Sequence, residues 1–254
     1  MQPSTTAPAM VAPPTEWTVT VGGEGRIAPA WPGADMSRIA FSVLPMFGIR
    51  KAGTPPSFFA PRDSLGFSII DLGQFRLGPV GKLLWPRKGS SDLGLNGLGD
   101  IGYTLQVGGF VEFWPVQWLR LRTEVRQGFG GENGVTGDLS ADVVVPVGPV
   151  TLSGGPRLTL QSSAAVSPYF SITPTQSIAS GLPVYSAAGG VYSYGGGVQA
   201  RYFWSEQWAT HAFLEYERLT GDAANSPLVV QRGSSNQFMY GLGTTYSFNM
   251  PSFW

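Results

Sequence analysis

One stretch decides the fold: FMYGLGTTYSF, residues 238–248. Successive side chains of a β-strand point to opposite faces, so alternate residues share a face. One face carries Phe238, Tyr240, Leu242, Thr244, Tyr246 and Phe248, and the other carries Met239, Gly241, Gly243, Thr245 and Ser247. A strand of a soluble sandwich is shorter and rarely so aromatic on one side. The stretch therefore predicts a long strand with one apolar face, as in a transmembrane β-barrel.

Two further stretches alternate in the same way. At 101–114 one face is apolar, with Ile101, Tyr103, Leu105, Val107, Val111 and Phe113. At 118–127 one face is charged, with Arg120, Arg122, Glu124 and Arg126. In a barrel a charged face lines the lumen and an apolar face meets lipid, whereas in a soluble sandwich the charged face meets bulk water. Alternation alone fits both architectures.

The composition favours the barrel. Only 13% of the 254 residues are charged and 35 are glycine, which suits a barrel better than a helical protein. Lys plus Arg equals Asp plus Glu at 16 each, which argues against nucleic acid as a partner. Without cysteine the chain has no disulfide framework and no thiolate chemistry. No segment approaches the roughly 18 consecutive apolar residues of a transmembrane helix, so only closed strands can span a membrane.

The connections between the strands differ in length and in aromatic content. Short turns at 115–117 and 205–207 are flanked by tryptophans that suit an aromatic girdle at the membrane interface, namely Trp114, Trp118, Trp204 and Trp208. The opposite connections, at 128–137, 161–190 and 221–236, are long and polar. Short turns at one end and long loops at the other predict a periplasmic and an extracellular side.

The strand count follows from the alternation and the turns. Eleven strands are predicted, near 17–27, 38–50, 65–71, 75–85, 101–114, 118–127, 138–147, 150–161, 191–204, 208–219 and 238–248. A single-chain barrel with both ends in the periplasm needs an even number. We therefore predict a twelfth strand at 57–60, between two prolines, and an all-β antiparallel barrel of twelve strands. Ten strands is the alternative if 57–72 folds differently.

The start of the chain differs from the remainder. Residues 1–15 contain four prolines, no Lys or Arg and no long apolar core, so they do not form a signal peptide. We predict a disordered leader at 1–15, with the signal peptide absent from this chain, followed by a single barrel domain at 16–254.

The predicted lumen face gathers charges of both signs. These are Glu24, Arg26, Arg50, Arg76, Lys82, Glu112, Arg120, Arg122, Glu124, Arg126, Asp142, Arg157, Arg201, Glu215 and Glu217. One hypothesis is an ion-pair network that fills a narrow barrel, since buried charges must be paired. The other is a charged pore whose slight excess of arginine favours anions. We favour the network, because a barrel of about twelve strands has an interior between the packed interior of eight strands and the open channel of sixteen.

The only histidine, His211, is the one possible base for serine hydrolysis. Alternation turns His211 inward. Outer-membrane phospholipases carry a serine two positions from their histidine, but this chain has Phe213 at that position. We therefore predict that His211 is a polar residue of the lumen lining and not a catalytic base. We predict no catalytic residues, no cofactor and no transition-metal site, although a loop carboxylate such as Asp222 suits Ca²⁺.

Two loops carry motifs of a known family, YFSITPTQ at 169–176 with SGLPVY at 180–185, and GDAANSP at 221–227. The motif residues are Tyr169, Phe170, Thr173, Gln176, Ser180, Gly181, Leu182, Pro183, Tyr185, Gly221, Asp222, Ala223, Ser226 and Pro227. The segments GLGDI at 97–101 and LRTEVRQ at 121–127 match as well. From Trp17 to Phe248 the chain resembles the MipA/OmpV family, the MltA-interacting proteins of Gram-negative outer membranes.

The resemblance implies location and function. Family members are described as scaffolds that hold a lytic transglycosylase and a murein synthase together at the bacterial outer membrane, and others as adhesins or porin-like proteins. It implies outer-membrane lipid and the outer-membrane insertion machinery as partners, and no known catalytic residues. The tail at 251–254 departs from the family, which usually stops at a phenylalanine equivalent to Phe248, so either Phe248 or Trp254 is the terminal aromatic of the insertion signal. A small-solute channel and a surface adhesin are the alternatives to the scaffold.

Overall fold

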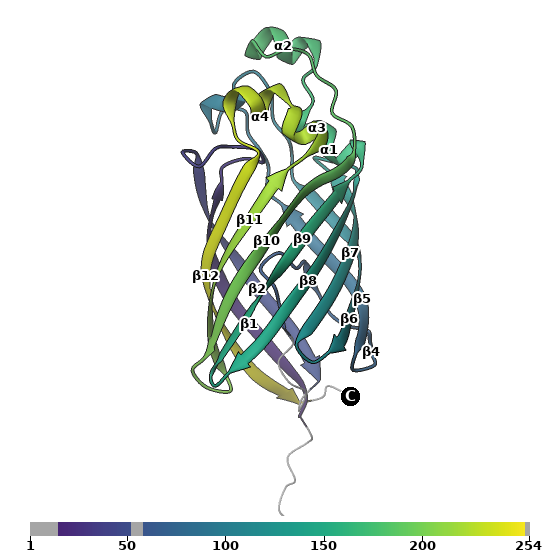
Figure 1. The fold of residues 1–254 in the computed structure, drawn as a ribbon, viewed down its shortest axis with the longest axis vertical. Helices are drawn as coiled ribbons and strands as arrows, with labels where there is room; N and C mark the ends of the chain where they lie inside the picture. The colour runs from purple at the N-terminus through teal and green to yellow at the C-terminus, as the bar shows by residue number, and fades with distance from the viewer. Residues whose placement is uncertain (1–14, 52–57, 252–254) are drawn as a thin grey trace, which may run out of the picture.

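The computed structural model describes residues 15–51 and 58–251, which form one antiparallel sheet curled into a nearly closed barrel (Figure 1). Its strands are β1 (Thr15–Pro29), β2 (Ile39–Lys51), β3 (Leu65–Gly66), β4 (Ile70–Asp71), β5 (Phe75–Leu84), β6 (Thr104–Val116), β7 (Leu119–Gly130), β8 (Val135–Val147), β9 (Val150–Gln161), β10 (Gly190–Phe203), β11 (Trp208–Leu219) and β12 (Asn236–Pro251). From β5 to β12 each strand pairs with the next, and β12 closes onto β1. The predicted barrel of twelve antiparallel strands is confirmed.

The two ends of the barrel differ as the loop lengths predict. Thr15 pairs with Pro251, so the first strand begins and the last strand ends at the same end of the barrel. The short turns after β4, β6, β8 and β10 lie at that end, and the long loops with all the helices lie at the other (Figure 1). We assign the short-turn end to the periplasm and the helical end to the cell exterior. No helix in the described ranges is both long and apolar enough to cross a membrane.

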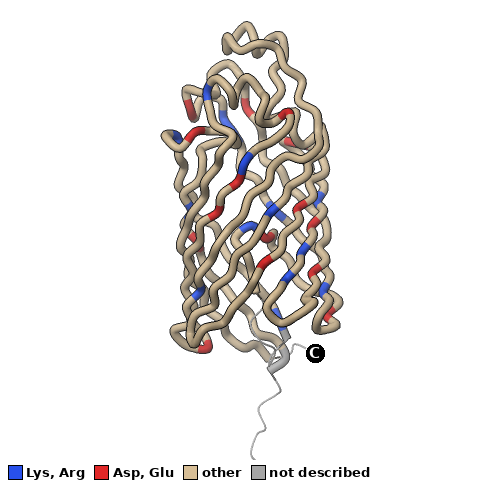
Figure 2. The backbone as a smooth tube through the Cα atoms, in the orientation of Figure 1, with Lys and Arg blue, Asp and Glu red and all other residues tan. Residues whose placement is uncertain are grey.

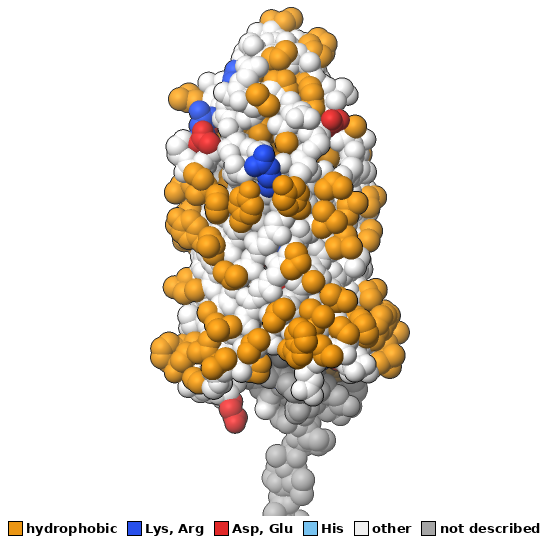
Figure 3. Space-filling model, viewed as in Figure 1, with side chains coloured by type: hydrophobic (Ala, Val, Ile, Leu, Met, Phe, Trp, Pro, Cys, Tyr) orange, Lys and Arg blue, Asp and Glu red, His pale blue; other side chains and the backbone are white. Residues whose placement is uncertain are grey.

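The decisive strand has the two faces that its alternation predicts. Phe238, Tyr240 and Leu242 of β12 are 37%, 41% and 61% exposed, whereas Thr245 is 3% exposed and points inward. The same division holds around the barrel. Figure 2 shows charged residues along many strands, while the face seen in Figure 3 has almost none between the two ends and carries many apolar side chains there. Large apolar side chains are exposed on the other strands as well. The barrel therefore presents hydrocarbon to its surroundings and keeps its charges inside, as lipid requires.

The twelfth strand comes from a different segment than predicted. Residues 58–60 form no strand, so the expectation for 57–60 is wrong there, and residue 57 lies outside the described ranges. The predicted strand at 65–71 instead divides into β3 and β4, which both pair with β5. The register of β3 on β5 differs by one residue from that of β4 on β5. Residues 67–69 therefore form a bulge between β3 and β4, which together make one side of the hairpin with β5.

Helices occupy the extracellular loops. They are η1 (Leu93–Leu95), α1 (Ser163–Phe170), α2 (Pro174–Ser180), α3 (Gly221–Asn225) and α4 (Pro227–Arg232). The long loop predicted at 161–190 supplies α1 and α2, and it folds over the end of the barrel with the other loops (Figure 1). The predicted leader at 1–15 and the tail after Pro251 lie outside the described residues, apart from Thr15 in β1.

Candidate functional site

Arg120 lies at the centre of the charged lumen and is fully buried. Its guanidinium donates to three carboxylates, which are Asp63 at 2.6 Å, Glu112 at 2.8 Å and Asp142 at 3.1 Å. Asp142 comes from β8 and stands directly opposite Arg120, whereas Glu112 comes from β6 and stands opposite Arg122, the next inward position of β7. The planar fork of arginine suits several carboxylates at once. Arg120 therefore ties three adjacent strands together from inside.

The network continues along β7 on every second residue. Arg122 pairs with Glu112 at 3.2 Å and with Glu124 at 2.7 Å. Arg126 pairs with the other oxygen of Glu124 at 2.5 Å and with Asp138 of β8. Glu112 and Glu124 thus each meet more than one guanidinium. A network in which every charge has a partner is rigid, and it leaves no continuous row of unpaired charges along this wall.

Residues 58–64, which we call the luminal segment, lie inside the barrel. Asp63 binds Arg120, and the backbone N–H of Ser64 donates to Glu124 at 3.2 Å. Arg62 reaches the opposite wall, where it pairs with Glu217 of β11 at 3.3 Å and with Glu215 at 3.6 Å. The luminal segment therefore crosses the lumen, because Arg62 binds β11 while the adjacent Asp63 binds β7 on the other side.

A second inward cluster anchors the luminal segment from the side of β1. Glu24 is buried and forms a salt bridge with Arg26, and its other oxygen lies 2.7 Å from His211 Nε2. Arg26 also donates to the Pro61 carbonyl at 2.6 Å. His211 is thus a buried lining residue engaged by one carboxylate, and none of the contacts found for it involves a serine hydroxyl.

The extracellular end is closed by loops that pack on one another, which we call the cap. Two hydrophobic clusters form its core, and both combine residues from different loops. The first comprises Trp31, Ala34, Leu95, Leu98, Ile172, Leu182 and Leu228, and the second comprises Val166, Phe170, Ala187, Leu219, Ala223 and Val229. Since water-excluding clusters of this size form only when the loops meet, the cap is a small folded unit above the barrel.

Two arginines fasten the cap by binding backbone carbonyls. Arg232 donates to the carbonyls of Gly94 and Ser180, which joins α4 to η1 and α2. Arg87 donates to the Tyr169 carbonyl at 2.9 Å and lies over the Tyr169 ring. Burial lowers the pKa of Arg87 to about 10, because the desolvation of its charge outweighs the attraction of Tyr169 and Asp100.

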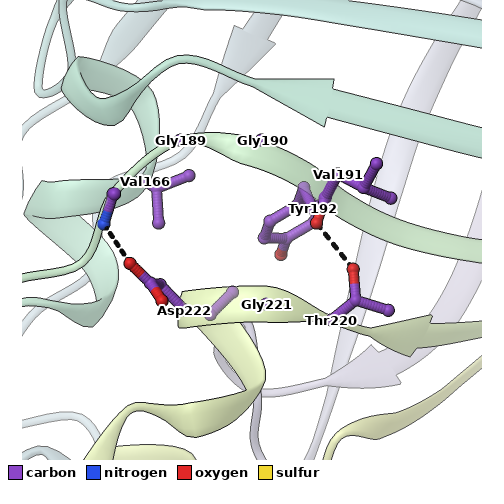
Figure 4. Close-up of a pocket in the computed structure, with 10 residues that line it drawn as sticks. Val166, Gly189, Gly190, Val191, Tyr192, Thr220, Gly221 and Asp222 are labelled. Carbon is purple, nitrogen blue, oxygen red and sulfur yellow. Dashed lines mark hydrogen bonds between the residues drawn. The ribbon is translucent and has the colours of Figure 1, made fainter.

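A pocket of about 330 Å³ opens at the rim between α1, the start of β10 and α3 (Figure 4). The Asp222 carboxylate crosses it to accept from the Ala188 N–H at 2.7 Å, and the Thr220 hydroxyl donates to the Val191 carbonyl. No cluster of three metal-ligating side chains occurs in the described ranges. Asp222 therefore acts here as a bridge between two loops, and the geometry lends no support to the suggested calcium site.

Comparison with known families adds one decisive match. The model for "MltA-interacting protein MipA" matches residues 21–248. The chain belongs to the MipA family. With its apolar outer band, buried charges and closed strands, this MipA family member is a bacterial outer-membrane β-barrel protein.

Solved structures and curated proteins add little to the family match. An outer-membrane channel from Pseudomonas putida F1 is 12% identical, with a TM-score of 0.46 over 96% of this chain and 100% of that one. The NanC porin is 9% identical, with a TM-score of 0.42 over 91% of this chain and 98% of that one. No curated protein matched significantly. At these identities and TM-scores neither likeness bears on what this MipA family member does.

The loop motifs of the MipA family member build the cap. Thr173 and Gln176 form a capping box that starts α2, and Gln176 also donates to the Leu98 carbonyl at 2.6 Å. The buried Ser226 hydroxyl donates to the Phe170 carbonyl, and the Tyr185 hydroxyl donates to the carbonyl of Asp222. Other motif residues end or begin helices or are buried in the clusters, as with Gly181, Pro227, Leu182 and Ala223. These motifs thus hold one loop against another.

The structure brings most of the predicted lumen charges together and adds others. Glu112, Asp142 and the β7 charges share one network, which Arg157 extends from Asp142 toward Glu215. The prediction omitted Asp138 from the lumen charges, although Asp138 lies four residues before Asp142 and therefore on the same face of β8. Arg62 and Asp63 were also missed, and no periodic signal marks them because they lie outside any strand.

One member of the predicted aromatic girdle faces the wrong way. Trp118, Trp204 and Trp208 are exposed on the outside near the periplasmic end. Trp114 instead turns inward, where its indole N–H donates to Glu112 at 2.8 Å. Ile101, expected on the lipid face, precedes β6 and is buried beneath the loops. Both errors arise where a strand ends and its alternation no longer sets the direction of a side chain.

We expect Gly97→Ala to loosen the contact between the loop after η1 and α2. Gly97 has a φ of +82°, and an added Cβ would lie 2.5 Å from the Ala179 backbone. Strain and clash together should cost about 1–3 kcal/mol locally. Limited proteolysis of the intact barrel should cleave α2 several-fold faster. Gly99→Ala is the control, because Gly99 has a similar φ of +75° but open space around it; equal cleavage in both variants would contradict the role of the contact.

Proposed function

We propose that this MipA family member is a closed, non-enzymatic scaffold that binds a lytic transglycosylase, together with a murein synthase, at the periplasmic face of the outer membrane. The observation that carries the proposal is the luminal segment, which is tied to two sides of the lumen. Arg62 and Asp63 bridge opposite walls, and the cap covers the extracellular end. A barrel filled in this way suits a rigid membrane anchor better than a pore. The family's name describes a protein that interacts with MltA.

The arrangement of the side chains also supports a non-enzymatic role. The single histidine is buried against Glu24, with Nε2 engaged in that contact. A general base needs a nucleophile within hydrogen-bond reach, and the contacts found for His211 include none. The partner enzymes act on the cell wall, so the contact surface belongs to the periplasmic turns, where Trp118, Trp204 and the turn 204–207 are exposed.

Co-purification in mild detergent tests the scaffold. The lytic transglycosylase should be enriched over an unrelated barrel, and Glu206→Lys in the exposed periplasmic turn should reduce its recovery several-fold. Asp100→Lys makes the same change of charge in an exposed extracellular loop and should leave the recovery unchanged. No enrichment, or equal loss in both variants, would remove the scaffold role.

A small-solute channel is the second candidate. It is favoured by a cavity of about 430 Å³ on the periplasmic side of the luminal segment, lined by residues that include Arg50 and Arg201. The channel requires that the luminal segment or the cap move aside. Electrical conductance therefore separates the two candidates, since only a channel passes ions.

A further inference from the structure

The 430 Å³ cavity has features that neither an ion-pair network nor an anchor requires. It reaches from the luminal segment to the periplasmic turn at 204–207, and β1, β2, β5, β10 and β12 contribute to its wall. Its volume lies within the range of roughly 300–1,000 Å³ that is usual for small-molecule sites. The cavity is therefore large enough for a small molecule.

One side of the cavity is apolar even though it faces inward. Leu44 and Met46 occupy inward positions of β2, where the corresponding positions of β7 carry arginine and glutamate. Phe58 and Phe59 of the luminal segment line the cavity as well, and Phe203 adds a third ring. An inward apolar surface serves no purpose in a charged network, because it neither pairs charges nor meets lipid. It suits the hydrocarbon part of a ligand.

The periplasmic end of the cavity is cationic. Arg201 lies within electrostatic range of Arg50, and both line the cavity. Arg201 donates to the Thr245 hydroxyl at 3.2 Å, its Nε is buried without a partner, and within residues 15–51 and 58–251 it forms no salt bridge. The lining residues Arg26, Arg62, Arg76 and Arg122 form salt bridges with carboxylates, so their charge is already balanced within the barrel. The guanidinium of Arg201 therefore favours an anionic group, such as a carboxylate or a phosphate.

The cavity also reaches the lipid-facing side of the wall. The hydrogen-bonded sheet ends at β2 on one side and at β3 on the other, and in the described ranges no backbone pairing joins these two edges. Exposed apolar side chains along this seam line the cavity, among them Phe47 and Ile49 of β2 and Leu83 of β5. The lining thus includes apolar side chains on the membrane-facing side of the wall as well as inside the lumen.

We propose that this cavity binds a single-chain anionic lipid from the surrounding membrane. The headgroup lies between Arg50 and Arg201, and the acyl chain lies along Leu44, Met46 and Phe58 and enters through the seam between β2 and β3. One chain suits a cavity of this volume better than the two chains of a phospholipid. The site is independent of the scaffold, because it requires no protein partner.

Photolabelling of the full chain in phosphatidylcholine vesicles tests the site. The probe is palmitate with a diazirine at the end of its chain, and peptide mass spectrometry locates the adducts. Adducts should concentrate on 44–50 and 58–68. Arg201→Gln should lower their yield about tenfold or more, as expected for the loss of a charge-assisted contact. Arg218→Gln removes an exposed arginine from the far end of β11 and should leave the yield unchanged.

Two further arms make the outcome decisive. Gly48→Leu should block labelling in a folded barrel, because a Cβ at Gly48 meets only Thr20 at 3.7 Å and the added side chain enters the cavity. The methyl ester of the probe, which lacks the charge, should label the cavity no more than the remainder of the outer band. Labelling spread evenly around the barrel, or equal in Arg201→Gln and the unmodified chain, would overturn the proposal. Competition by inorganic phosphate as effective as that by palmitate would also overturn it, since it would indicate a simple anion site.

Discussion

Replacing Arg120 with alanine is expected to lower the free energy of unfolding of the barrel by about 3–5 kcal/mol. The substitution leaves Asp63, Glu112 and Asp142 near one another without their shared cation. Arg122 and Arg157 still neutralise part of that charge, but neither reaches all three carboxylates. Urea titration in micelles, followed by the gel mobility that distinguishes folded from unfolded barrels, measures the change.

Two comparisons give the Arg120 result its meaning. Arg218→Ala removes an exposed arginine and should change the free energy by no more than about 0.5 kcal/mol. Adding Asp63→Asn to Arg120→Ala should recover part of the loss, because one uncompensated carboxylate is gone. If Arg120→Ala unfolds at the same urea concentration as Arg218→Ala, the ion pairs of the lumen are exposed to water and contribute little to the stability of the barrel. That result would contradict the account.

Trp31→Ala is expected to open the cap while the barrel stays folded. Trp31 is 2% exposed and packs in the first cluster beside Leu95 and Leu228. Its removal leaves a cavity that should cost about 3–5 kcal/mol of stability in the cap. The loss is slightly smaller than for a fully paired side chain, because the buried indole N–H of Trp31 has no hydrogen-bond partner to lose. A loss of this size exceeds what a small cluster of loops can withstand. Protease added from outside should then cleave the loops within α2 and α4, and heat-modifiable mobility should persist.

The control for Trp31→Ala lies in the same cap. Ile178 of α2 is 88% exposed, so Ile178→Ala removes an apolar side chain without making a cavity. Its loops should resist protease as well as those of the unmodified chain. Loss of the barrel itself in Trp31→Ala would contradict the view that cap and barrel are separate folded units.

Alternation along the strands made most of the barrel predictable. A strand repeats every two residues, so Phe238 and Arg120 each reveal their face from their neighbours alone. The luminal segment has no such repeat. Its position is set by Arg62 and Asp63 meeting charges that are distant in sequence, such as Glu217 and Arg120, and a single sequence gives no sign of that pairing.

The errors of the prediction fall where periodicity ends. Trp114 stands next to a turn, and a hydrogen bond to Glu112 outweighs the preference of tryptophan for the interface. The cap was also beyond sequence reasoning, because Leu182 and Trp31 lie on different loops and become a core only when those loops meet. Family motifs marked the cap residues but did not reveal that they bind one another.

The conductance of the unmodified chain in planar bilayers tests the closed barrel most directly. A sample first shown to be folded by its gel mobility is added to a bilayer in concentrated salt. With the luminal segment tied to opposite walls and the cap packed above it, we predict no single-channel steps above those of the bare bilayer. Regular steps that grow with salt concentration would contradict the closed barrel and establish the chain as a channel.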